Sequence, residues 1–130
     1  MAGPDVCGRP LHEMRSAILM FAVLAACNGG ASVSPAAKAE ARKIWTDRCA
    51  NCHGQTGMGD GPGAKVLPVK PRTFADSTWQ ASVTDEHIAK VITEGGAVNG
   101  LDSNMAANPD LLDEPEVVRA LVQKVRSLKP

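Results

Sequence analysis

The chain has 130 residues, and its 14 Lys and Arg residues balance its 14 Asp and Glu residues, so the formal net charge is zero. This length suits one small domain with a short extra segment, and the balanced charge excludes the basic composition of a nucleic-acid-binding domain. Aromatic residues make up only 3% of the chain, so a core of ordinary size needs another large apolar body at its centre. The four cysteines (Cys7, Cys27, Cys49 and Cys52) are too unevenly spaced for a disulfide framework.

The first part of the chain has the features of an export signal. Arg15 precedes an apolar block from Ala17 to Ala26, which is short for a membrane span but suits a signal peptide. The block ends in Leu24-Ala25-Ala26-Cys27, which resembles the bacterial lipobox, in which the cysteine is lipidated and becomes the first mature residue. We therefore expect a signal peptide over residues 1–27 and a lipid on Cys27 that anchors the protein to a membrane, facing the periplasm.

The mature chain is predicted to be all-α, with a flexible tether over residues 28–35 and one domain over residues 36–130. Ser34 and Pro35 suit the N-cap and first position of a helix that runs on to His53. Five glycines between Gly54 and Gly63 predict a loop, and the prolines of "LPVKPRTF" predict an extended or turn-like segment. No stretch has the alternating pattern of a strand.

Two further helices are predicted in the second half of the domain. Thr84 caps the first, which spans residues 85–94 and ends at Gly95-Gly96. Residues 97–110 form a polar loop. Asp113 and Glu116 have the spacing of a capping box at the start of the last helix, which spans residues 114–128.

The stretch "RCANCHG" holds Cys49, Cys52 and His53 and permits three kinds of site. A thioredoxin-like dithiol normally lies at a helix start within a βαβ pattern, whereas these cysteines follow a helix. A structural zinc site needs four ligands, and only His87 could complete the set. A Cys-x-x-Cys-His sequence in an exported chain is typical of covalent haem attachment, and a haem also provides the apolar centre that the aromatics do not.

On these residues the chain resembles the class I, single-haem c-type cytochromes of bacteria. The resemblance covers about residues 36–129, and it includes Trp45, "CHGQTGMGDGPGA", "TDEHIAKVITEGG" and "LLDEPEVVRALVQKVRSL". It implies a small cytochrome c fold, with three main helices and long loops around one covalent haem c held by Cys49 and Cys52.

The resemblance also implies the ligands of the iron. His53 is the expected proximal ligand and Met105 the expected distal one. Met58 lies too close to His53 in sequence to reach the opposite face of the ring. Bis-histidine ligation through His87 is the rival, although the flanking residues suggest that His87 lies on the surface.

Two further roles follow from the resemblance. Pro62 matches the proline whose carbonyl accepts the second N–H of the proximal histidine, and Arg72 is placed to face a haem propionate. The implied function is one-electron transfer to redox partner proteins, with no enzymatic activity and no small-molecule substrate. The alternative is a haem enzyme or gas sensor whose distal position is open.

Overall fold

The computed structural model describes residues 32–130, so the predicted signal peptide, Cys27 and the first half of the tether lie outside the described residues. The longer helices are α1 (Pro35–Ile44), α4 (Asp85–Glu94) and α5 (Pro115–Arg126), and two shorter ones are α2 (Ala50–His53) and α3 (Ser77–Ser82). Turns of 3-10 helix lie at Pro62–Val66, Ala97–Asn99 and Pro109–Leu111. Residues 32–130 contain no strand, which confirms the all-α prediction.

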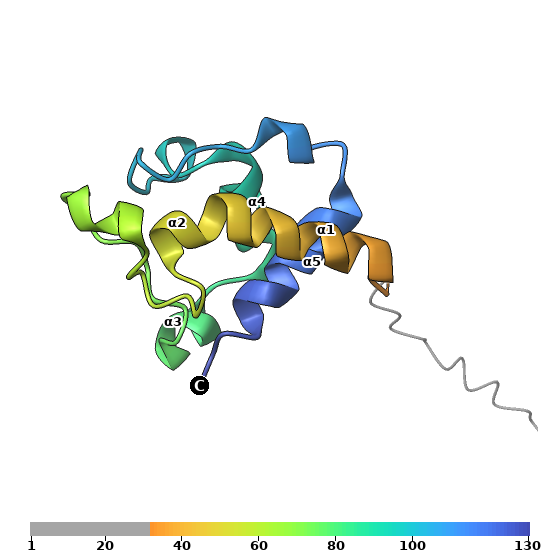
Figure 1. The fold of residues 1–130 in the computed structure, drawn as a ribbon, viewed down its shortest axis with the longest axis horizontal. Coiled ribbons are helices and arrows are strands. Elements are labelled where there is room, and N and C mark those ends of the chain that lie inside the picture. The colour runs from red at the N-terminus through yellow and green to blue at the C-terminus, as the bar shows by residue number, and fades with distance from the viewer. Residues whose placement is uncertain (1–31) are drawn as a thin grey trace, which may run out of the picture. The chain divides into compact units, whose positions relative to one another are not determined.

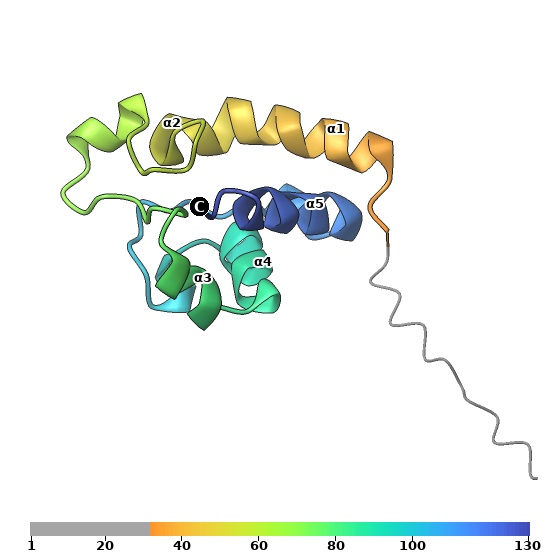
Figure 2. The same cartoon turned by 90° about the horizontal axis from the view of Figure 1, so that it is seen from below.

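Helix α5 is the centre of the packing (Figure 2). It lies between α1 on one side and α4 on the other, and it contacts both. One face of α5 is buried: Val117, Leu121 and Val125 all lie in the core, and Leu128 packs against it. Leu121 is the most deeply buried large side chain, with 2% of its surface exposed.

Local sequence rules account for most of the helix ends. The Ser34 hydroxyl accepts a hydrogen bond from the Ala37 N–H, and the Thr84 hydroxyl accepts one from the His87 N–H. Gly95 ends α4 with a φ of 82°, in the left-handed region that favours glycine. The N-caps and the helix stop predicted at these positions are therefore confirmed.

Two features of the chain differ from the prediction. The tether is shorter than residues 28–35, because Val33 is buried in the core and the Ser34 N–H donates a hydrogen bond to Glu116 Oε1 at 2.6 Å. The same bond explains why the predicted capping box does not form. The Glu116 carboxylate is bound to the Ser34 N–H at the start of α1, while Glu114 occupies the N-cap position of α5 without a side-chain hydrogen bond.

Helix α3 was not predicted (Figure 1). It follows Asp76, whose carboxylate accepts hydrogen bonds from the N–H groups of Thr78 and Trp79. Its Gln80 is buried, with Nε2 donating to the carbonyls of Phe74 and Val125. Arg126 of α5 in turn donates to the carbonyl and side-chain oxygens of Gln80. This network fastens α3 to the end of α5.

Candidate haem site

The two site cysteines lie where α1 continues into α2. Between these helices, Trp45–Cys49 winds as one π-helical turn, in which the Ala50 N–H bonds to the carbonyl of Trp45. The chain is therefore helical as far as His53, as predicted, but the prediction did not include the π-helical turn. Cys49 and Cys52 are about one helical turn apart, both half-buried and both free. π-Helical turns are frequent at functional sites.

The glycine-rich loop closes over the end of α2. The Gly59 N–H donates to the carbonyl of His53 at 2.8 Å, and the Gly61 N–H donates to the carbonyl of Cys52 at 3.2 Å. A Cβ atom at Gly61 would collide with the carbonyl oxygens of Ala50 and Asn51. The loop therefore satisfies the free carbonyls at the helix end and holds the backbone of His53 in place.

His53 projects into an aromatic cluster. Its ring stacks on Phe74, with centroids 4.7 Å apart and planes inclined by 20°, and it lies 6.5 Å from the ring of Trp45. Burial lowers the pKa of His53, and the backbone of Arg72 partly offsets this effect. The neutral imidazole, which is the form that binds a metal, is therefore favoured.

Cys49 lacks the electrostatics of a reactive thiol. Burial raises its pKa to about 11, and the nearby charge of Arg48 only partly counteracts this. Redox-active and metal-binding cysteines act as thiolates and normally have a lowered pKa. This environment does not favour the dithiol hypothesis. In addition, no group of three or more His, Cys, Asp and Glu side chains within residues 32–130 is arranged to hold a metal ion.

These residues fit a covalent haem c. Two free thiols lie one turn apart on a helix, and the histidine that follows favours its neutral form. The Nδ1 atom of His53 is buried without a hydrogen-bond partner among the described residues. The surrounding side chains of Trp45, Phe74 and Trp79 are apolar or aromatic, as the ring of a haem requires.

Met105 is held by the two glycines that end α4. The Gly96 N–H donates to the carbonyl of Met105 at 2.8 Å. A Cβ atom at Gly95 would lie 2.9 Å from that carbonyl oxygen, and one at Gly96 would lie 3.1 Å from the Cβ of Met105. Met105 is half-buried in this position. The sequence identified Gly95-Gly96 only as a helix stop and gave no signal for this second role.

The other two ligand candidates lie on the surface. Met58 is 51% exposed, and its sulfur lies 3.8 Å from the Thr73 hydroxyl. His87 is exposed in the first turn of α4. These surroundings agree with the expectation that neither side chain belongs to the buried site.

The contact predicted between Pro62 and His53 is not formed. Pro62 begins a 3-10 turn, and its carbonyl does not accept a hydrogen bond from the buried Nδ1 of His53. Arg72 is half-exposed, with Nη1 3.5 Å from Asp76 Oδ2 and the guanidinium 5.9 Å from the centroid of the Trp79 ring. The backbone of Arg72, rather than that of Pro62, affects the protonation of His53.

Comparisons with known proteins agree with this geometry. Residues 36–123 match the family described as "Cytochrome C oxidase, cbb3-type, subunit III". The solved structure of "KustC0563 c-type cytochrome" is 34% identical to the chain and has a TM-score of 0.51. That match covers 68% of this chain and 95% of the other. No curated protein matches the chain.

The matched region contains α2, α3 and α4, most of α1 and α5, and all the residues predicted to hold the haem and its iron. The chain belongs to the cytochrome c family of cbb3-type subunit III, and it is a small all-α, single-haem c-type cytochrome that carries electrons on a covalently bound haem c.

Proposed function

We propose that the haem iron is bound axially by His53 and Met105, with Cys49 and Cys52 as the covalent tethers. When bound, the haem supplies a one-electron couple between the ferrous and ferric states of iron, and a His/Met ligand pair gives this couple a high potential. The observation that carries the proposal is the bracing of Met105 by Gly95 and Gly96, because it fixes the backbone of a half-buried methionine.

This ligand pair has a functional consequence. If His53 and Met105 both bind, no coordination position remains for a substrate, so the protein is a carrier and not an enzyme. Its partners are then redox proteins that it meets in brief encounters through small interfaces. The balanced charge gives no electrostatic preference for one class of partner.

Substitution of the methionines tests the ligand pair. A methionine sulfur on ferric haem gives a weak absorption band in the far red. We expect Met105→Ala to abolish this band and Met58→Ala, the matched control, to retain it. A band that survives in Met105→Ala would rule out this ligand. A high-spin ferric spectrum in the unsubstituted protein would indicate an open distal position, and loss of low-spin iron in His87→Ala would indicate bis-histidine ligation.

We further propose that the protein is exported and anchored on the periplasmic side of a membrane by a lipid on Cys27. The lipobox-like Leu24-Ala25-Ala26-Cys27 supports this proposal. Within residues 32–130, no helix is long and apolar enough to cross a membrane. Intact mass spectrometry of protein extracted from membranes should show a diacylglycerol adduct on Cys27, and an unmodified Cys27 would contradict the anchor.

A further inference from the structure

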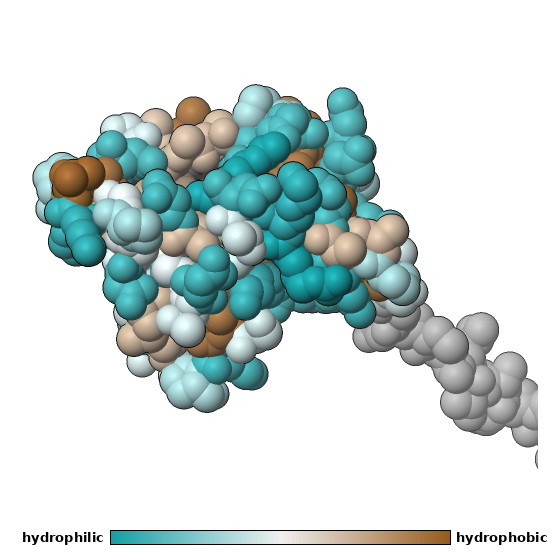
Figure 3. All heavy atoms as spheres, in the orientation of Figure 1, coloured by the Kyte–Doolittle hydropathy of each residue, from teal (hydrophilic) through white to brown (hydrophobic). Residues whose placement is uncertain are grey.

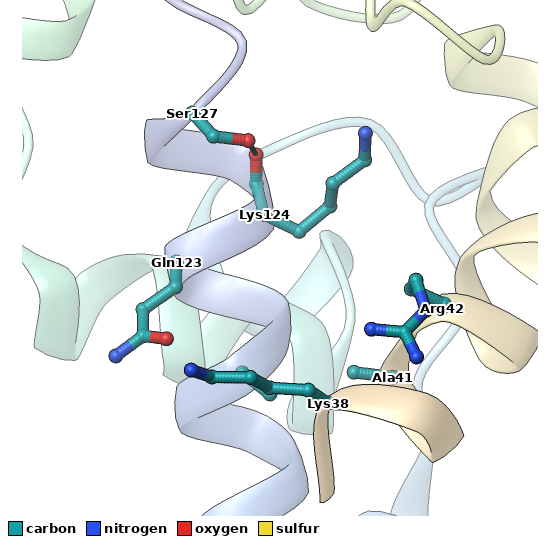
Figure 4. A pocket seen from close by; sticks show the side chains of 7 residues that line it. Lys38, Ala41, Arg42, Gln123, Lys124 and Ser127 are labelled. Atoms are coloured by element: carbon teal, nitrogen blue, oxygen red, sulfur yellow. Dashed lines mark hydrogen bonds between the residues drawn. The ribbon is translucent and has the colours of Figure 1, made fainter. Parts of the chain in front are cut away.

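A hollow of about 190 Å³ lies between α1 and α5, on the surface of the domain (Figure 4). Its floor contains two small side chains, Ala41 of α1 and Ala120 of α5, which are both buried. Because neither helix carries a large side chain at this point, the two backbones leave open space above the floor. This space is several times larger than one water molecule needs.

Cations surround this hollow. Lys38 and Arg42 extend from α1, Lys124 extends from α5, and Gln123 and Ser127 complete the lining, which contains no carboxylate. Figure 4 shows Lys38 reaching toward Gln123 and the guanidinium of Arg42 pointing toward α5. Both helices therefore contribute cations to the lining of the hollow.

These three cations are not neutralised by the rest of the domain. Elsewhere, five of its Lys and Arg side chains form ion pairs, with Asp47, Asp110, Asp76, Glu94 and Asp85. Among residues 32–130, no carboxylate lies within ion-pair distance of Lys38, Arg42 or Lys124. Unpaired cations around one hollow create a positive potential that attracts an anion.

We propose that this hollow binds a phosphate oxyanion. A guanidinium offers a fork of donors that suits two phosphate oxygens, and ammonium groups act as point charges beside them. Arg42 therefore supplies the fork, and Lys38 and Lys124 supply the flanking charges. An inorganic phosphate carries close to two negative charges above neutral pH. Three cations match this charge better than they match the single charge of a carboxylate.

The hollow is also connected to the haem site. The Lys124 ammonium lies 5.3 Å from the centroid of the Trp45 ring, and that ring lies 6.5 Å from the ring of His53. A bound anion that attracts Lys124 would change the environment of the indole. The N–H signal of Trp45 in an NMR spectrum therefore reports on the hollow, while Trp79, whose neighbouring cation is Arg72, serves as an internal reference.

The test is a titration of the haem-loaded, full-length protein with inorganic phosphate at constant ionic strength. We expect a saturable shift of the Trp45 indole N–H and none of Trp79. Lys38→Gln and Arg42→Gln should each weaken binding by about threefold, while Lys65→Gln, which lies outside the hollow, should leave it unchanged. No saturable shift, an equal response to acetate, or an equal loss in Lys65→Gln would overturn the proposal.

A second titration distinguishes two sources of the phosphate. Glycerophosphoglycerol is a soluble phosphodiester that represents the headgroup of an anionic lipid. The diester carries a single negative charge, so tighter binding of it than of inorganic phosphate would mean that the rest of the headgroup adds contacts, and would identify a lipid headgroup as the ligand. The reverse order would identify a soluble phosphate. Either order supports an oxyanion site, and binding of neither compound contradicts it. The result does not depend on which side chain is the distal iron ligand.

Discussion

The main-chain N–H of Gly96 donates a 2.8 Å hydrogen bond to the carbonyl of Met105, so the end of α4 fixes the backbone of the proposed distal ligand. Gly95 also lies against the loop that carries Met105, since a Cβ atom on Gly95 would lie 2.8 Å from the Ala107 nitrogen and 2.9 Å from the Met105 oxygen. The glycine pair therefore both ends a helix and shapes the ligand loop. This double role makes the pair a direct route to testing the site.

Gly95→Ala should loosen the Met105 loop. The substitution adds a Cβ atom against the loop backbone and places alanine at a φ of 82°, and together these effects should cost about 2–3 kcal/mol. The far-red ferric band should consequently be lost at a lower temperature than in the unsubstituted protein. The control is Gly100→Ala, because Gly100 has a φ of 70° but no heavy atom within 4 Å of an added Cβ. Equal effects of the two substitutions would mean that contact with the Met105 loop is unimportant.

Glu116→Ala should destabilise the domain by removing the partner of the Ser34 N–H. The bond is 2.6 Å long and joins the start of α1 to the first turn of α5. A hydrogen bond to a charged group contributes about 1.5–3 kcal/mol, so the midpoint of urea unfolding should fall accordingly. Glu114→Ala is the matched control, because Glu114 makes no side-chain capping bond. A change no larger than that of the control would show that the bond contributes nothing.

Gln80→Ala should have a larger effect on stability. The Gln80 amide donates to two carbonyls from inside the core, and its own oxygens accept from Arg126. Its removal leaves the buried carbonyl of Phe74 without a donor and that of Val125 with only its main-chain bond from Leu128. This should cost about 2–4 kcal/mol in the free energy of unfolding. Arg119 is exposed on the same helix as Arg126. Arg119→Met should stay within about 0.5 kcal/mol of the unsubstituted protein, and a similarly small effect of Gln80→Ala would contradict the network.

Lys124→Gln should lower the midpoint potential of the haem. The Lys124 cation lies 5.3 Å from the Trp45 ring, which lies 6.5 Å from the His53 ring. A positive charge near the haem disfavours ferric iron, which carries one more positive charge than ferrous iron. Removing the Lys124 charge therefore favours the oxidised state. For two charges about 12 Å apart, Coulomb's law gives a decrease of about 15–60 mV for effective dielectric constants between those of water and a protein surface. Potentiometric titration beside Lys65→Gln measures the shift, and an unchanged or raised potential would contradict it.

Much of the fold could be predicted from interactions between residues that are close together in the sequence. The hydroxyls of Ser34 and Thr84 accept hydrogen bonds from free N–H groups in the first turn of a helix. This interaction is local, so it does not depend on where the helix packs in the fold. The same rule applies to Asp76, and α3 could have been predicted from it. The motif of Cys49, Cys52 and His53 also lies within five consecutive residues, so its chemistry was evident from the sequence.

The features that the sequence did not predict depend on contacts between distant segments. Glu116 has the spacing of a capping residue for its own helix, but its carboxylate accepts a hydrogen bond from the N–H of Ser34 instead. Pro62 was expected to accept a hydrogen bond from His53, whereas the Nδ1 atom of His53 has no partner within residues 32–130. The bracing of Met105 by Gly95 and Gly96 requires the ligand loop to fold back on α4. No local sequence pattern determines which of several possible partners such groups contact in the folded protein.

The most direct test of the account is an NMR spectrum of the ferrous, haem-loaded protein with isotope-labelled methionine methyl groups. A methyl group on a sulfur bound to iron lies over the haem ring, whose ring current shifts its proton signal strongly upfield. We predict that the Met105 methyl signal has this shift and that the Met58 signal does not. A Met105 methyl signal at an ordinary position would contradict the ligation proposed here.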